Sequence, residues 1–157
     1  MAQKDDCIFC KIVDGDIPAM KVYEDDHCLA FLDISQATKG HTLLIPKNHE
    51  ENIYELQEET AAHLLSKAPA IARAMKSTLQ CEGMNLVNNN GEKASQSVFH
   101  FHMHLIPRYG NDEIYANWNE NPKIDMSDED MHALAGRVQQ AVQSKTRGGP
   151  SFSKGFH

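Results

Sequence analysis

Three histidines alternate with apolar residues in the second half of the chain, at His100, His102 and His104. Because successive side chains point to opposite faces of a β-strand, a strand over residues 98–107 places the three imidazoles on one face, roughly 6.5–7 Å apart. A neutral imidazole can attack phosphorus with one ring nitrogen when a fixed acceptor holds the proton of the other nitrogen. We therefore predict that His102 is a nucleophile and that its two neighbours hold phosphate oxygens or the leaving group.

Two other interpretations of this pattern stay open. A His-x-His pair on a strand can hold one catalytic metal ion, which predicts sensitivity to chelators, and three polar residues on a solvated sheet face need no chemistry at all. Residues 96–98 favour the nucleophile, because exposed backbone N–H groups at a turn into a strand suit a phosphate. Ser97 could also hand a proton to the leaving group, although serine is common at the start of a strand.

The elements that must position these residues follow from hydrophobic periodicity. The predicted strands span residues 20–24, 28–33, 41–46, 84–88 and 98–107. Apolar residues at helical spacing predict one helix over residues 58–80, with Pro69 as an objection to it. Ser127 is predicted to cap a second helix, because Asp130 follows three residues later and an apolar stripe comes after it. The expected fold is α+β, with a five-stranded antiparallel sheet and two helices.

Length and composition limit the classes of protein. With 157 residues, the chain fits one domain, predicted over residues 1–143, followed by a flexible Gly- and Ser-rich tail over residues 144–157. Apolar runs are far shorter than the roughly 20 residues that span a bilayer, and the N-terminus does not resemble a secretory signal, so we expect a cytoplasmic protein without a membrane partner. The net charge of -7, with scattered Lys and Arg, argues against a nucleic-acid polymer as partner.

The four cysteines suggest a metal site near the N-terminus. Cys7 and Cys10 form a Cys-x-x-Cys pair that offers two thiolates, and a tetrahedral zinc ion needs two further nitrogen or sulfur ligands. Buried or redox-active thiols are the alternative interpretation of such a pair. Cys28 and Cys81 have no surroundings in the sequence that indicate catalysis.

The segment His100-Phe-His-Met-His-Leu-Ile resembles the histidine triad superfamily of nucleotide hydrolases and transferases, whose signature is His-φ-His-φ-His-φ-φ with φ apolar. The resemblance continues upstream through Cys7-Ile-Phe-Cys, Gly15-Asp-Ile-Pro-Ala, Ala30-Phe-Leu-Asp-Ile-Ser and Gly40-His-Thr-Leu-Leu-Ile-Pro-Lys-Asn-His, and covers residues 5–110. It implies a five-stranded antiparallel sheet with two helices, and a homodimer.

The resemblance also implies roles for individual residues. His102 matches the nucleophile that forms a nucleotidyl-histidine, and His41 and His104 match the histidines that flank the phosphate. Asp33 matches the carboxylate that accepts from the ribose hydroxyls. The apolar pocket for the base matches Ile8, Phe9, Phe31 and Ile34. The residues around the α-phosphate match Asn89, Gln96 and Ser97. Several family members with this Cys-x-x-Cys pair bind zinc. The resemblance therefore implies a structural zinc ion, with Cys7, Cys10, His49 and His100 as its ligands.

We therefore predict a nucleotide-binding hydrolase or transferase that cleaves a phosphoramidate or phosphoanhydride bond at the α-phosphate of a purine nucleotide. The alternatives are a dinucleoside polyphosphate hydrolase and a nucleotide-binding interaction protein without catalysis. Ser95 stands where the adenosine phosphoramidase branch commonly has Gly, and Ile-Pro-Arg at residues 106–108 looks more like the dinucleoside polyphosphate hydrolase branch. Trp118 and the loop over residues 109–123 are predicted to border the pocket.

Overall fold

The computed structural model describes residues 4–110, 112 and 127–146. The chain divides into two compact units, Met1–Ile114 and Tyr115–His157. The first unit carries the sheet together with every predicted site residue. The predicted loop with Trp118 and the tail beyond residue 146 lie almost entirely outside the described residues.

A five-stranded antiparallel sheet forms the centre of the first unit, as predicted, with strand order β1-β2-β3-β5-β4. Its strands are β1 (Lys21–Glu24), β2 (Cys28–Leu32), β3 (Thr42–Pro46), β4 (Gly83–Val87) and β5 (Met103–Arg108). The first four agree with the predicted strands to within one residue at each end.

The fifth strand begins later than predicted, at Met103 instead of residue 98. Strand pairing on the two sides of β5 stops at Met103, which pairs with Leu44 of β3, and at His104, which pairs with Val87 of β4, so the segment before Met103 has no registered strand partner. It is held irregularly instead, by the Phe101 N–H donating to the Glu50 carbonyl at 2.6 Å. The alternation of faces nevertheless continues through this segment, because Phe101 and Leu105 both belong to the core on one face of the sheet.

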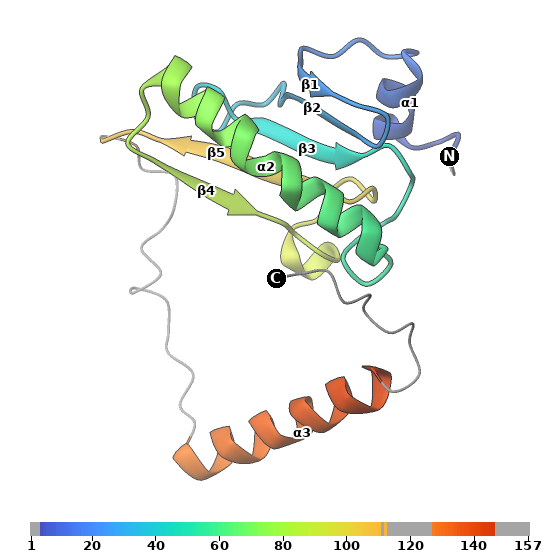
Figure 1. The fold of residues 1–157 in the computed structure, drawn as a ribbon, viewed down its shortest axis with the longest axis vertical. Helices are drawn as coiled ribbons and strands as arrows, with labels where there is room; N and C mark the ends of the chain where they lie inside the picture. Colours follow the sequence, from blue (N-terminus) through green and yellow to red (C-terminus); the bar gives the residue numbers. More distant parts are fainter. Residues whose placement is uncertain (1–3, 111, 113–126, 147–157) are drawn as a thin grey trace. The chain divides into compact units, whose positions relative to one another are not determined.

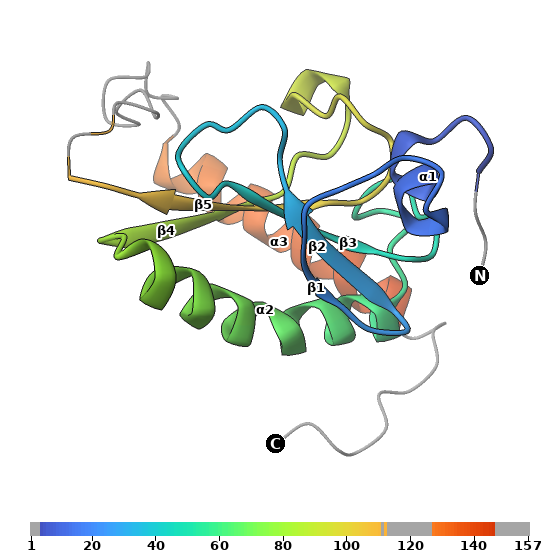
Figure 2. The same cartoon turned by 90° about the horizontal axis from the view of Figure 1, so that it is seen from above.

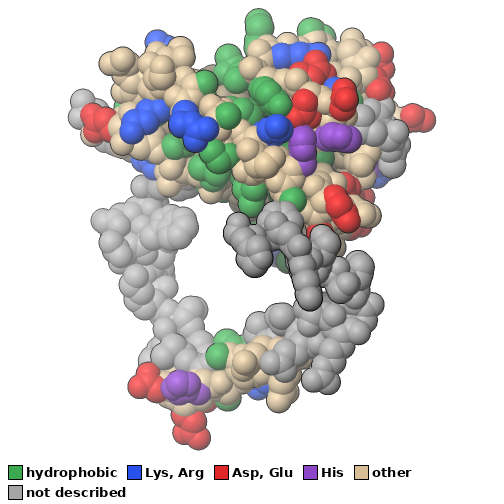
Figure 3. Space-filling model, viewed as in Figure 1, with side chains coloured by type: hydrophobic (Ala, Val, Ile, Leu, Met, Phe, Trp, Pro, Cys, Tyr) green, Lys and Arg blue, Asp and Glu red, His purple; other side chains and the backbone are tan. Residues whose placement is uncertain are grey.

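Helix α2 (Glu58–Leu79) lies along one face of the sheet (Figures 1 and 2). Its buried side chains are Leu64, Ala68, Ile71 and Met75, which recur at helical spacing. Pro69 lies inside the helix without ending it, on the exposed side, where a carbonyl that loses its helical partner can reach water. On this face of the unit, histidine side chains lie beside acidic ones (Figure 3), and His63 Nε2 pairs with Asp25 Oδ2 at 2.8 Å.

Periodicity predicts two helices, and the structure adds a third short one, α1 (Ile8–Asp14). The Cys7 side chain caps it by accepting from the Cys10 N–H at 3.4 Å, and Gly15 ends it with a left-handed φ of 82°. Cysteine is not one of the usual capping residues, so Cys-x-x-Cys indicates metal ligands more readily than a helix start. Gly15 is the signal that could have revealed the helix end.

Both faces of the sheet are covered, which explains why β2 and β3 are buried over nearly their whole length. The core under α2 contains Cys28, Ala30, Leu44, Phe101 and Leu105. The core on the opposite face, under α1, contains Phe9, Ile12, Leu29, Phe31, Leu43 and Ile45. His104 pairs directly with Leu43, and cross-strand partners share a face, so the histidines lie on the α1 side.

The second unit contains α3 (Asp128–Thr146), the second predicted helix. Its predicted cap is present, because the Asp130 N–H donates to Ser127 Oγ at 3.1 Å. The predicted domain boundary at residue 143 falls three residues before the end of this helix. Among the described residues, no helix combines the length and the apolar character that crossing a membrane requires.

Candidate active site

His102 is buried where the chain enters β5, with 4% of its surface exposed. Its Nδ1 donates to the carbonyl of His100 at 2.8 Å, which places the proton of the neutral ring on Nδ1 and leaves the Nε2 lone pair free. The ring of Phe9 packs edge-on against the imidazole, with centroids 5.1 Å apart. One backbone acceptor therefore sets the tautomer, and an aromatic ring keeps water from one side of His102.

A relay of two asparagine side chains fixes the backbone of His102. Asn88 Nδ2 donates to the His102 carbonyl at 2.9 Å, and Asn88 Oδ1 accepts from Asn90 Nδ2 at 2.5 Å. Asn90 Oδ1 in turn accepts from the Ile53 N–H at 2.7 Å. Residue types alone did not single out Asn88 or Asn90, although the run of three asparagines at residues 88–90 is a signal in the sequence.

His41 and His104 form a hydrogen-bonded pair beside His102, with His41 Nε2 2.8 Å from His104 Nδ1. The Ala37 N–H donates to His41 Nδ1 at 3.1 Å, so neutral His41 carries its proton on Nε2 and donates it to His104. His104 then carries its own proton on Nε2. Its ring lies 5.0 Å from that of His102, centroid to centroid. A nucleophilic nitrogen and an N–H donor are thus neighbours.

Burial keeps these imidazoles uncharged. It lowers the pKa of His104 to about 4, helped by the nearby His102 and His41. Burial also lowers the pKa of His41, against the opposing charge of Asp33. The pKa of His102 is lowered by burial too, although the His100 carbonyl opposes the shift. At neutral pH the group therefore consists of neutral rings, the state in which a nitrogen lone pair is available for attack.

Cys7, Cys10, His49 and His100 form a second cluster, and their ligand atoms all lie within 4.8 Å of one another. Cys10 Sγ is 3.3 Å from His49 Nδ1 and 3.5 Å from His100 Nδ1, and Cys7 Sγ is 3.5 Å from His100 Nδ1. A tetrahedral zinc ion with ordinary Zn–S and Zn–N bonds separates its sulfur and nitrogen ligands by about 3.6 Å. These three distances therefore fit a tetrahedral zinc ion to within about 0.3 Å.

The surroundings of this cluster orient its ligands. His100 Nε2 donates to the Pro46 carbonyl at 2.8 Å, which directs the lone pair of Nδ1 toward the thiols. The backbone N–H groups of Lys4 and Cys10 donate to the sulfurs of Cys10 and Cys7, each at 3.4 Å. Burial raises the pKa of the Cys10 thiol to about 11, so this thiol is protonated at neutral pH unless a cation displaces the proton.

Comparison with known proteins agrees with this geometry. The family model of the HIT domain matches residues 14–111. Protein hit from Bacillus subtilis (strain 168) is 52% identical over 141 residues, which make up 89% of this chain and 97% of that protein. The chain belongs to the HIT family.

Other relatives of this HIT protein carry more specific names. Adenosine 5'-monophosphoramidase hnt1 of Schizosaccharomyces pombe is 39% identical over 141 residues, covering 87% of this chain and 98% of that protein. The crystal structure of a HIT family protein from Bacillus anthracis has a TM-score of 0.81 at 50% identity and covers 88% of this chain and 99% of its own. A zinc-bound histidine triad family protein from Mycobacterium smegmatis has a TM-score of 0.67 at 37% identity, with 87% and 97% covered.

The predicted base-pocket residues of this HIT protein divide into two kinds. Phe9 and Phe31 are buried against each other, with ring centroids 5.6 Å apart, and belong to the core under α1. Ile8 and Ile34 are exposed, at 46% and 99% of their surfaces, and are free to contact a ligand. Asp33 lies between Phe31 and Ile34 in sequence; its Oδ1 accepts from the Ser35 N–H at 2.7 Å, and its Oδ2 is 3.6 Å from His41 Nε2.

The loop before β5 contains the other predicted phosphate-site residues. Gln96 is buried, and its amide contacts only backbone groups in the hydrogen bonds that the structure shows: the Gly91 N–H and the carbonyls of Glu51 and Val98. Its side chain therefore holds the loop in shape. Asn89 is half-buried beside the asparagine relay.

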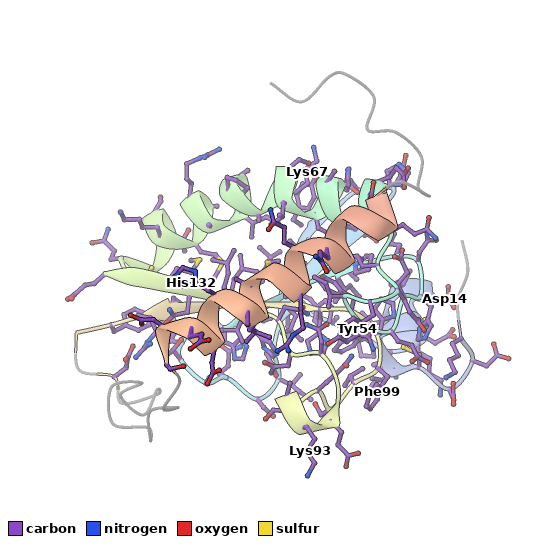
Figure 4. All side chains as sticks on the ribbon, turned by 90° about the horizontal axis from the view of Figure 1, so that it is seen from below. Asp14, Tyr54, Lys67, Lys93, Phe99 and His132 are labelled. Atoms are coloured by element: carbon purple, nitrogen blue, oxygen red, sulfur yellow. The ribbon has the colours of Figure 1, made fainter. Side chains whose placement is uncertain are left out.

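Ser95 and Ser97 are both exposed in this loop. Ser95 has a φ of 69°, the left-handed conformation that glycine adopts most readily, which explains why glycine suits this position. Ser97 lines a cavity of about 310 Å³ together with Ile8, Val98 and Phe99, and its other lining residues are Lys4, Asp6, Cys7 and His49, of which the last two belong to the metal-ligand cluster. Phe99 points outward from the loop, as does Lys93 on the preceding turn (Figure 4).

Proposed function

We propose that this HIT protein transfers or hydrolyses nucleotides by cleaving a phosphoramidate or phosphoanhydride bond at the α-phosphate of a purine nucleotide. The observation that carries the proposal is the hydrogen bond from His102 Nδ1 to the His100 carbonyl, which leaves a buried, neutral Nε2 as the nucleophile. The name of the hnt1 relative, a monophosphoramidase, supports the phosphoramidate as substrate.

The reaction divides into two steps. His102 Nε2 forms a bond to the α-phosphorus while the bond from phosphorus to the leaving group breaks, which gives a nucleotidyl-histidine. The leaving amine or oxygen needs a proton, and His104 Nε2–H or the Ser97 hydroxyl supplies it. Water then attacks the same phosphorus, and one of its protons returns to the group that protonated the leaving group. The bond to His102 breaks, and the nucleoside monophosphate leaves. The hydrogen bond between His41 and His104 then restores the starting tautomers of these two rings.

Binding of the nucleotide uses residues at the edge of this group. Asp33 has one carboxylate oxygen without a backbone donor among its contacts, and it accepts from the ribose hydroxyls. Exposed Ile8 and Ile34 sandwich the purine, with Phe9 and Phe31 as the floor behind them. Asn89, Ser97 and backbone N–H groups of the loop held by Gln96 surround the α-phosphate.

Zinc, when bound by Cys7, Cys10, His49 and His100, has a structural role in this proposal. Four protein ligands close a tetrahedral site, which supplies a rigid cross-link between α1, the end of β3 and the segment before β5. The carbonyl of one of these ligands, His100, accepts from His102. The cluster therefore holds the acceptor that sets the tautomer of the nucleophile.

A catalytic metal in the histidine group is disfavoured by its geometry. Asp33, His41 and His104 lie close enough to hold an ion. However, the nitrogens of His41 and His104 are 2.8 Å apart, the length of a hydrogen bond, whereas two nitrogen ligands of one tetrahedral ion stand about 3.3 Å apart. This pair shares a proton.

Trapping the intermediate tests the proposal. Quench-flow with a labelled adenosine phosphoramidate should give an acid-labile adduct that mass mapping places on His102, and His102→Ala should abolish both adduct and turnover. His132→Ala is the matched control, because His132 is exposed on α3 (Figure 4). Turnover by His102→Ala equal to that of the natural protein would sink the mechanism. Nucleotide binding without turnover, in the natural protein as in the variants, would instead favour a nucleotide-binding interaction protein without catalysis. A preference for a dinucleoside polyphosphate as substrate would favour a dinucleoside polyphosphate hydrolase.

We also propose that the protein pairs as a homodimer. Strand β4 is at the edge of the sheet, and its Leu86 is 49% exposed, so an apolar side chain and unpaired backbone groups are available to a second copy. The proposed tail over residues 144–157 overlaps the last three residues of α3 and otherwise lies outside the described residues. Sedimentation of the natural protein and of Leu86→Lys checks the dimer, since a charge at the interface should shift the protein to monomer.

A further inference from the structure

The turn between β2 and β3 is held by the side chain of one exposed residue, Gln36. Its Nε2 donates to the carbonyl of Asp33 and to the carbonyl of His41, the latter at 2.8 Å. Its Oε1 accepts from the Gly40 N–H at 2.7 Å. One amide therefore ties together the first residue of the turn, its last residue and the glycine before it.

The same turn presents the backbone group that sets the tautomer of His41. The Ala37 N–H, next to Gln36 in the chain, donates to His41 Nδ1 at 3.1 Å. This donor places the His41 proton on Nε2, where the Asp33 carboxylate lies 3.6 Å away, and that proton is the one donated to His104. If the turn changed shape, the Ala37 N–H would no longer point at His41 Nδ1. The rings of His41 and His104 could then each carry the proton on either nitrogen.

The middle of the turn is also anchored to β5 and to the residue after it. Thr38 Oγ1 donates to the Pro107 carbonyl at 2.6 Å, and Tyr109 Oη donates to the Lys39 carbonyl at 2.6 Å. These contacts hold the middle of the turn against β5. Backbone hydrogen bonds from the Asp33 N–H to the His41 carbonyl at 2.9 Å and from the His41 N–H to the Thr38 carbonyl at 3.0 Å help to close the turn. Gln36 adds side-chain hydrogen bonds at both ends of the turn, next to the Ala37 N–H that faces the His41 ring.

We propose that Gln36 is a positioning residue for nucleotidyl transfer: by closing the turn over residues 33–41, it aims the Ala37 N–H at His41 and so directs the proton of His104 toward the leaving group. This inference rests on the proposed function for its catalytic consequence. Its structural part, the fixed tautomer of His41, holds independently of any substrate.

Long-range ¹H–¹⁵N spectra of the imidazoles test the structural part first. The natural protein should show His41 protonated on Nε2 alone. Gln36→Leu removes all three hydrogen bonds, and Gln36→Glu keeps the size and the Gly40 contact but turns a carboxylate oxygen toward two carbonyls. Both variants should show His41 as a mixture of tautomers. Gln139→Leu, at an exposed glutamine of α3, is the matched control and should leave the spectrum unchanged.

Steady-state kinetics with the adenosine phosphoramidate test the catalytic part. Both Gln36 variants should lower kcat by roughly 10- to 100-fold with little change in KM, because misaimed donors affect the transition state more than binding. An unchanged His41 spectrum in Gln36→Glu, the variant that perturbs the fold least, overturns the inference, as does a mixed spectrum with unchanged kcat. Absence of turnover in the natural protein would defeat the proposed function alone, and the spectra would still decide the role of Gln36.

Discussion

Replacing Cys10 by serine tests whether the Cys7, Cys10, His49 and His100 cluster is a structural zinc site. Cys10 is 1% exposed, and its sulfur lies 3.3 Å and 3.5 Å from the ligand nitrogens of two histidines. Serine keeps the approximate shape but offers a harder, shorter and less easily ionised ligand, so we expect the affinity for zinc to fall steeply.

The magnitude follows from the geometry of the site. Because the sulfur–nitrogen distances are within about 0.3 Å of those in an ideal tetrahedron, little reorganisation opposes binding to the natural protein. A thousandfold loss of affinity at fixed free zinc corresponds to about 4 kcal/mol less stabilisation of the folded state. Zinc should therefore raise the free energy of unfolding of the natural protein by several kcal/mol and leave that of Cys10→Ser almost unchanged.

Urea unfolding at buffered free zinc and in chelator measures both proteins. Cys81→Ser is the matched control, because this thiol is also buried but lies outside the cluster. An equal zinc response in Cys10→Ser and the natural protein would refute the assignment of ligands. Chelation that abolishes nucleotide turnover while the fold stays intact would refute the structural role and favour metal-dependent catalysis.

Three further predictions concern hydrogen bonds that support the site or the fold. Asn88→Ala should lower the free energy of unfolding by about 1–3 kcal/mol and kcat by more than KM changes, because it frees the His102 carbonyl; urea unfolding and kinetics check this. Thr38→Val should cost about 1–3 kcal/mol in urea unfolding, since the buried Pro107 carbonyl loses its donor, and an unchanged value would show that water replaces it. Burial alone would raise the pKa of Asp25, but hydrogen bonds from neighbouring backbone and side-chain donors hold this pKa well below 3.8. The carboxylate therefore stabilises the fold fully above pH 3.8, and its contribution is lost as the pH falls further. The urea midpoint of the natural protein should drop below about pH 4 more steeply than that of Asp25→Asn, and parallel curves would contradict the assignment.

Local patterns in the sequence determined much of the architecture. Short apolar runs between polar or Gly-containing turns mark β2 and β3. The 3.6-residue spacing of Leu64, Ala68, Ile71 and Met75 marks α2, because this period depends only on backbone geometry. The alternation of histidine with apolar residues assigned the three histidines of residues 100–104 to one side of the chain. Helix α1 was missed, since it has only seven residues and an unusual cysteine cap.

Tertiary structure alone decided which distant residues share a proton or a ligand site. His41 and His104 are 63 residues apart, and they meet because β3 and β5 pair in the register that sets Leu43 opposite His104. The tautomers of His41 and His102 likewise depend on backbone groups whose positions no local period encodes. The sequence determined which side chains are chemically able to act. The fold determined where each of their protons lies, because hydrogen-bond geometry depends on contacts between segments that are far apart in the chain.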